Sequence, residues 1–187
     1  MVKQGLMMIR SVESIASSRK NFSLFHCKCL PEAIALLRKH NPDTLKVLES
    51  LPRFDYGVKP PEGVRNEVQV LPGQQLVDGG GWYFGEWALG ERKEMEGRGI
   101  LVTKEGGVYE GWFLKGRLTG LGRYVSVEEE VYEGPFKNGV FHGRGVFKWP
   151  TGARYDGDFL QGERCGNGAM LYSNGNRYDG EWLGDKK

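Results

Sequence analysis

A few residues of this sequence are of types and at spacings that could carry chemistry, and the first are the sulfur and imidazole groups of His26-Cys27-Lys28-Cys29. Zinc sites usually combine two ligand pairs, with two to four residues between the cysteines of a pair. A single residue separates Cys27 from Cys29, and no second pair follows. We therefore predict no metal site here.

The other candidates for catalysis are isolated side chains. His40 is expected at a helix end, and His142 and Cys165 occupy equivalent turn positions of a repeat. Covalent catalysis instead needs a nucleophile in contact with a base. Gly-x-Gly pairs recur, but none precedes Gly-Lys-Ser/Thr or opens a helix, as phosphate-binding loops do. We expect no catalytic residue, no cofactor and no enzymatic activity.

Two groups of carboxylates are expected to be solvated. Asp156 and Asp158 alternate along a predicted strand, as exposed strand residues do. The acidic run Glu128–Glu130 occupies a predicted turn. It is either a solvated loop or a docking point for a basic partner.

The elements that position these residues follow from a repeat. The phrase Tyr-[Glu/Asp]-Gly-x-[Phe/Trp] recurs every 23 residues, and a second phrase, Gly-x3-Gly-x-Gly, follows it at constant offset. A first copy, with three extra residues, precedes the series. Periods in this range indicate a repeat array. The aromatic positions are Tyr83 and Trp87, Tyr109 and Phe113, Tyr132 and Phe136, Tyr155 and Phe159, and Tyr178 and Trp182.

Each unit reads as a β-hairpin, because the two aromatic residues and the glycine between them point to one face of a strand. The pattern, including His142-Gly143-Arg144-Gly145, resembles the MORN (membrane occupation and recognition nexus) repeat. The resemblance covers residues 82–187, as four full repeats and a partial fifth. It implies a scaffold or adaptor role, because such arrays occur in cytoskeletal and scaffold proteins and as appendages of enzymes.

The predicted fold is mainly β: an elongated, open, single-layer antiparallel sheet of MORN-repeat hairpins with a short α-helical N-terminal segment. Glycine columns should act as floors for aromatic rings. The ten aromatic residues then form a groove for a helix or extended peptide of another protein; alternatively, they only stack on glycine and on each other. The strand Arg177–Leu183 should be a sheet edge, which we expect another chain or a second copy to cap.

Three segments precede the array. Residues 1–30 are an N-terminal arm, acid-poor and rich in Ser and basic residues; this composition also resembles a mitochondrial targeting sequence. Residues 31–51 read as two short amphipathic helices, with Asn41 as N-cap and Pro42 at the first helical position of the second. Such helices must dock on the array or on another chain. Residues 52–81 read as an extended Pro/Gly linker.

Composition narrows the function. Residues 82–187 carry 15 basic and 16 acidic side chains, which does not suit nucleic acid binding and gives only weak support to membrane contact. Three unevenly placed cysteines favour a reducing compartment. The resemblance to MORN proteins implies a cytoplasmic scaffold in a cytoskeletal or ciliary assembly, such as an axonemal radial spoke. The alternatives are a membrane- or phosphoinositide-kinase-associated module and a mitochondrial accessory subunit.

Overall fold

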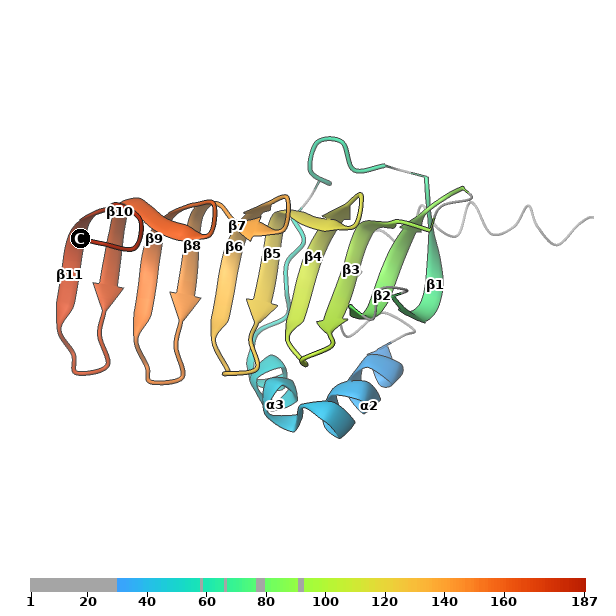
Figure 1. The fold of residues 1–187 in the computed structure, drawn as a ribbon, viewed down its shortest axis with the longest axis horizontal. Coiled ribbons are helices and arrows are strands. Elements are labelled where there is room, and N and C mark those ends of the chain that lie inside the picture. Colours follow the sequence, from blue (N-terminus) through green and yellow to red (C-terminus); the bar gives the residue numbers. More distant parts are fainter. Residues whose placement is uncertain (1–29, 58, 66, 77–79, 91–92) are drawn as a thin grey trace, which may run out of the picture.

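A computed structural model describes residues 30–57, 59–65, 67–76, 80–90 and 93–187. The described strands form one eleven-stranded antiparallel sheet in which strands pair in the order of the sequence, except that β6 pairs with both the short β7 and β8 (Figure 1). The described parts of β1 and β11, the two end strands that a closed barrel would join, pair only with β2 and β10 respectively. The predicted open single-layer sheet is therefore confirmed. The strands are β1 Val68–Gln75, β2 Gly81–Ala88, β3 Met95–Thr103, β4 Val108–Leu114, β5 Arg117–Val125, β6 Val131–Lys137, β7 Val140–Phe141, β8 Gly143–Lys148, β9 Arg154–Leu160, β10 Glu163–Leu171 and β11 Arg177–Trp182.

The glycines of the two phrases come into register across the sheet. In the middle of the array Gly99 pairs with Gly111, and Gly111 pairs with Gly122. Further along, Gly145 pairs with Gly157, which also pairs with Gly168. Glycine weakens a strand unless something packs on it, so this row needs large side chains laid across it.

Strand alternation gives the sheet two faces. The ring face carries the repeat tyrosines and the Phe or Trp four residues after each of them. The helix face carries the residues between them, such as Val108, Glu110 and Trp112. We use these two names throughout.

Two helices cover part of the helix face, α2 (Leu30–His40) and α3 (Pro42–Ser50) (Figure 1). As predicted, Asn41 caps α3 by accepting the Thr44 N–H at 3.1 Å, and Pro42 begins the helix. Leu37 and Leu48 are buried against Ile100, Val125 and their neighbours on β2–β6. The prediction that the helices must dock is therefore met within the chain itself.

The sequence analysis predicted residues 52–81 as an extended linker and missed one strand within it. Val68–Gln75 forms β1, which pairs with β2 and shifts register between Leu71 and Gln74. Nearer α3, Tyr56 and Val64 are buried against Trp112 on the helix face. The alternation Val68-Gln69-Val70 is a strand signal that the surrounding prolines and glycines obscured. We call residues 30–57 and 59–65 the lead segment.

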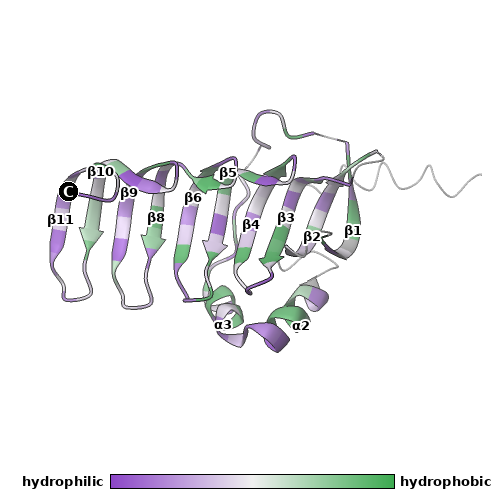
Figure 2. Cartoon of the chain, in the orientation of Figure 1, coloured by the Kyte–Doolittle hydropathy of each residue, from purple (hydrophilic) through white to green (hydrophobic). Residues whose placement is uncertain are grey.

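The lead segment covers the helix face only as far as β6. Figure 2 shows apolar residues on the helices and on β3, whereas β9 and β11 are mostly hydrophilic. The array therefore has an N-terminal half with a buried helix face and a C-terminal half with an open one.

Candidate binding surface

The ring face is built on tyrosines that lie over the glycine row. Tyr83, Tyr132 and Tyr155 are fully buried. The Tyr132 hydroxyl donates to the Pro135 carbonyl at 2.9 Å, and Tyr83 and Tyr155 make the same bond three residues on. A β-carbon at Gly145 would lie 2.5 Å from the Tyr132 hydroxyl oxygen. The predicted glycine floor is therefore present at Gly145, because only glycine leaves room for this ring. Gly143 is not a floor, because its φ is 64° and no aromatic ring lies within 4 Å of a β-carbon there.

Edge-on contacts join the rings of successive units. The Tyr132 centroid lies 5.2 Å from that of Phe136 in its own unit and 5.1 Å from that of Phe159 in the next. Tyr155 repeats this geometry with Phe159 and Trp182. Of the ten predicted groove residues, eight are buried and two, Tyr109 and Tyr178, are half-buried. The buried ones are Tyr83, Trp87, Phe113, Tyr132, Phe136, Tyr155, Phe159 and Trp182.

The second unit departs from this arrangement. A β-carbon at Gly122 would meet Leu118 and Phe136, each at 2.8 Å, and one at Gly111 would meet Leu118 at 3.0 Å. Leu118 thus occupies the floor where the other units place a tyrosine. Tyr109 instead stacks on Tyr124 with centroids 4.4 Å apart.

A column of side chains that the sequence analysis did not single out recurs at the 23-residue spacing: Met95, Leu118, Phe141, Arg164 and Lys187. In the last three units this side chain covers the repeat tyrosine, and we call the column the lid column. Phe141 stacks on Tyr132 at 4.0 Å. Arg164 lies 5.7 Å from the centroid of the Tyr155 ring, and the Lys187 ammonium lies 5.1 Å from that of the Tyr178 ring. The constant 23-residue spacing was the signal for this lid column, which changes from apolar to cationic along the array.

Half-buried rings lie next to the buried layer and line a depression. Phe141, Phe147 and Trp149 form one side, and the Arg164–Asp185 pair (2.7 Å) forms the other. The cavity measures about 240 Å³. Its walls suit an apolar side chain presented by another molecule, because aromatic rings supply large contact area at low entropic cost.

The last unit covers its own tryptophan. Trp182 is buried, donates its indole N–H to the Gly168 carbonyl at 3.2 Å, and lies under Arg164. Asp185 takes the place of the turn glycine, with φ 64°, and its N–H donates to the Arg164 carbonyl at 3.1 Å. A helix laid across Trp182 is therefore unnecessary for burying that ring. Within the described residues β11 pairs on one side only, so a capping chain stays a prediction.

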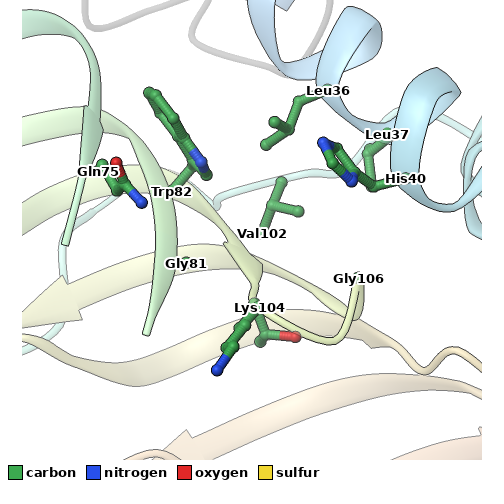
Figure 3. Close-up of a pocket in the computed structure, with 10 residues that line it drawn as sticks. Leu36, Leu37, His40, Gln75, Gly81, Trp82, Val102, Lys104 and Gly106 are labelled. Atoms are coloured by element: carbon green, nitrogen blue, oxygen red, sulfur yellow. The ribbon is translucent and has the colours of Figure 1, made fainter. Parts of the chain in front are cut away.

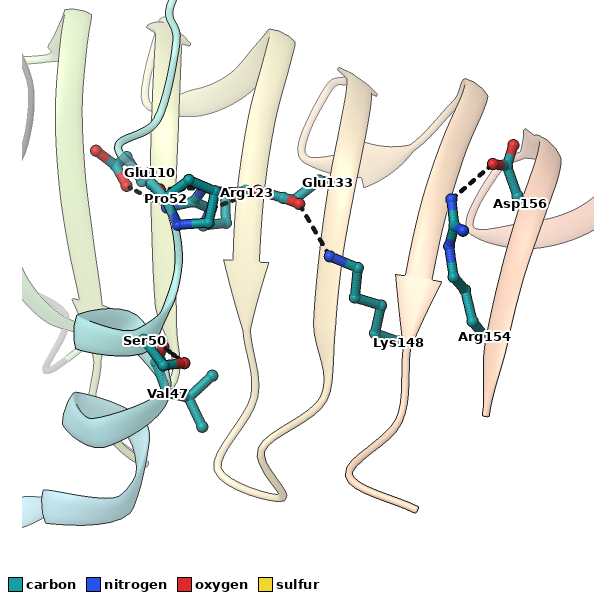
Figure 4. A network of polar contacts seen from close by, with 9 residues as sticks. All are labelled: Val47, Ser50, Pro52, Glu110, Arg123, Glu133, Lys148, Arg154 and Asp156. Atoms are coloured by element: carbon teal, nitrogen blue, oxygen red, sulfur yellow. Dashed lines mark hydrogen bonds and ion pairs between the residues drawn. The ribbon is translucent and has the colours of Figure 1, made fainter. Parts of the chain in front are cut away.

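The helix face holds a buried charge network that the sequence analysis missed (Figure 4). Arg123 lies between Glu133 at 2.6 Å and Glu110 at 3.7 Å, and also donates to the Pro52 carbonyl at 2.8 Å. Tyr56 donates to Glu110 at 3.3 Å, and burial raises the pKa of this phenol well above its usual range. The sequence did contain a signal for this network, because Glu110, Arg123 and Glu133 lie on three neighbouring strands. Their burial could not be predicted, because the lead segment that buries them is distant in sequence.

Beyond β6 the helix face carries exposed ion pairs. Lys148 lies 3.5 Å from Glu133, and Arg154 lies 2.8 Å from Asp156 (Figure 4). Asp179 pairs with Arg177 in the same way. Exposed pairs of this kind contribute little stability, and they leave this half of the face hydrated.

A smaller cavity lies where α2 meets β2 and β3, between Leu36, His40, Trp82 and Lys104 (Figure 3). Its volume is about 130 Å³. It lies where α2 packs on the sheet of the same chain, so we regard it as a packing gap at the helix–sheet seam.

The structure does not assemble the candidate catalytic residues. His26, Cys27 and Cys29 lie outside the described residues. His40 ends α2 and His142 precedes β8, while Cys165 lies on β10. Burial raises the pKa of the Cys165 thiol, which disfavours the nucleophilic thiolate. The described part of the chain contains no cluster of three or more metal-ligating side chains and no helix long and apolar enough to span a bilayer.

Repeated hairpins in one open sheet, each in contact only with its neighbours, define a quasi-one-dimensional repeat protein. The MORN repeat family model matches residues 109–128, 132–154 and 155–177, so three MORN repeats lie within residues 109–177 of this chain. Such repeats generally mediate interactions with proteins or membranes, and the repeat family is in general non-catalytic. No curated protein matches the chain.

Proposed function

We propose that this protein is a non-catalytic adaptor that binds a helix or extended segment of another protein along its ring face. The observation that carries the proposal is the line of half-buried rings from β5 to β11, with the cavity of Phe141, Phe147 and Trp149 at its centre. Extended repeat surfaces of this kind usually serve as binding faces.

The two faces differ in what they offer a partner. The lead segment already fills the N-terminal half of the helix face with Leu37, Leu48 and Tyr56. In the C-terminal half, Arg154 and Arg177 are held by carboxylates on their own strands. The ring face of the same half offers apolar area, which drives most protein association.

The assembly that we propose for this adaptor is cytoskeletal or ciliary, in the cytoplasm. The support for this is the resemblance of the repeats to those of cytoskeletal and axonemal proteins. A capping chain along the free side of β11 is part of the same proposal, because a sheet edge offers unpaired N–H and C=O groups for strand addition.

Photo-crosslinking in native cells tests the binding face. A photoreactive amino acid replacing Trp149 or Tyr172 should capture a specific protein, and the same group replacing Arg144, which projects from the helix face with 71% of its side chain exposed, should not. Equal capture from both faces contradicts the proposal.

Sedimentation with acidic liposomes separates a protein partner from a membrane. The balanced charge of the array predicts that the protein stays in the supernatant at physiological salt. Cosedimentation that is abolished by Trp149→Ala would assign the ring face to membranes instead.

A further inference from the structure

The lead segment packs on the helix face in two separate places. The helices α2 and α3 cover an apolar cluster that includes Ile100 and Val125. The extended residues 52–57 and 59–65, which we call the strap, instead pack Tyr56 against Trp112 in a second cluster. Among the described residues no side chain belongs to both clusters. The strap can therefore leave the sheet while the helices stay docked.

The strap covers charged side chains whose equivalents in later repeats are hydrated. The Glu110 side chain is 1% exposed, whereas Asp156 and Asp179, at the same position of later repeats, are 35% and 56% exposed. In the same way Arg98 is buried and its equivalent Arg144 is exposed. Burying charges costs hydration even when they are paired. Lifting the strap would thus return these groups to the environment that their positions have elsewhere in the array.

Side chains of the array hold the backbone of the strap. Arg123 donates to the Pro52 carbonyl at 2.8 Å (Figure 4). The Trp112 indole N–H donates to the Tyr56 carbonyl, also at 2.8 Å. These contacts do not depend on the strap's own side chains, so an extended segment of another protein could make them as well.

Two strap side chains give the site its selectivity. The Arg123 guanidinium lies over the Phe54 ring, 5.4 Å from its centroid, and the Tyr56 hydroxyl donates to Glu110 at 3.3 Å. The two strap rings meet edge to face with centroids 4.9 Å apart. Gly57 follows with φ 74°, a conformation that glycine adopts without strain. The sequence that fits the site is therefore aromatic-x-Tyr-Gly.

We propose that the helix face of β3–β5 carries a second binding site, which the strap occupies and from which an aromatic-x-Tyr-Gly segment of a partner protein displaces it. The strap is then a competitor built into the chain. Because α3 precedes it and β1 follows it, its effective concentration at the site is in the millimolar range. This site lies on the face opposite the proposed adaptor surface and does not depend on it.

A peptide that copies residues 51–65 is the probe for this site, with its binding to the full chain followed by fluorescence anisotropy. A chain carrying Phe54→Ser and Tyr56→Ser cannot hold its own strap. It should bind the peptide at least about tenfold more tightly than the unaltered chain does. Phenylalanine in place of Tyr56 in the peptide should weaken binding about tenfold, because the hydrogen bond to the Glu110 carboxylate is lost. Alanine in place of the exposed Lys59 should leave it unchanged.

Amide hydrogen exchange on the unaltered chain tests whether the strap opens by itself. The Arg65 N–H donates to the Glu96 carboxylate at 2.8 Å. It should exchange at least about tenfold faster than the amides of α3 and β4, because only the strap has to open. In the doubly substituted chain, α2 and α3 should stay protected. Exchange of the helices together with the strap, in either chain, overturns the inference.

The peptide outcomes separate this site from the proposed function. Equal affinity for the two chains, or binding to neither, overturns the second site and leaves the ring face untouched. Trp149→Ala, on the ring face, should not change the affinity of the doubly substituted chain for the peptide. Loss of binding on that substitution would assign the peptide to the ring face and likewise overturn the second site.

Discussion

Replacing Gly145 by alanine places one methyl group between the sheet and the ring of Tyr132. The β-carbon would lie 2.5 Å from the tyrosine hydroxyl oxygen and 2.6 Å from the nearest ring carbon. Tyr132 has nowhere to go, because Phe136, Phe141 and Phe159 pack around it. The ring must therefore tilt or leave its site.

The expected cost follows from the contacts that are lost. Overpacking costs about 1–3 kcal/mol, and loss of the 2.9 Å hydrogen bond to the Pro135 carbonyl adds about 0.5–1.5 kcal/mol. Restricting the unfolded chain returns about 0.4–1 kcal/mol. We expect the free energy of unfolding to fall by about 2–3 kcal/mol, which lowers the melting temperature by about 4–12 °C for a protein of this size.

Urea and thermal unfolding followed by tryptophan fluorescence measure this change. Gly107→Ala is the matched control, because its β-carbon would lie 3.4 Å from its nearest neighbours, which is an ordinary contact distance. In a Tyr132→Leu background Gly145→Ala should cost less than about 1 kcal/mol, because the smaller side chain vacates the floor. The hypothesis that Gly145 is a floor for the Tyr132 ring would be refuted by equal free energies of unfolding for Gly145→Ala and Gly107→Ala. It would also be refuted if the effects of Gly145→Ala and Tyr132→Leu on that free energy were fully additive.

Three further predictions concern other parts of the chain. Arg123→Ala leaves the Glu110 carboxylate buried without its cationic partner, so the free energy of unfolding in urea should fall by about 3–5 kcal/mol; a loss below 1 kcal/mol contradicts the network. Leu48→Ala should cost about 2–4 kcal/mol and increase amide exchange on β5 more than on β10; uniform exchange would contradict local docking. Burial raises the pKa of Tyr124 and of Tyr155 to about 12. Because the folded pKa exceeds the unfolded value near 10, this stability is complete below pH 10 and is lost as pH rises toward 12; in absorbance titration, normal ionisation of all eight tyrosines near pH 10 in the folded protein contradicts it.

The repeat could be derived from the sequence because its signals are local. Tyrosine and glycine in fixed phase indicate hairpins and floors, and the cap at Asn41 marks a helix start without any tertiary knowledge. Glu110 and Arg123 illustrate what was missed. Each looks like the solvated partner of an alternating strand, and only the lead segment, more than fifty residues away in sequence, buries them. No local pattern encodes such a contact.

The burial of the predicted groove residues has a related cause. Sequence periodicity placed Tyr132 and Phe136 on the apolar face correctly, but it does not report how deep a side chain lies. Glycine lets the rings sink onto the backbone, and the lid column then covers them. Accessible aromatic area is therefore supplied by residues outside the repeat phrase, such as Phe147 and Trp149.

The incomplete reach of the lead segment has a mechanical consequence. The strands lie across the long axis of the molecule (Figure 1), so the hydrogen bonds between them run along it. A pull along this axis loads successive strand pairs in series, and the weakest pair opens first. Between β2 and β6 the helices and Tyr56 bridge several strands at once, whereas β8 to β11 are held by their own pairing and rings. Under tension, the C-terminal half should therefore unzip strand by strand while the N-terminal half stays closed, which makes the protein extensible at one end and stiff at the other.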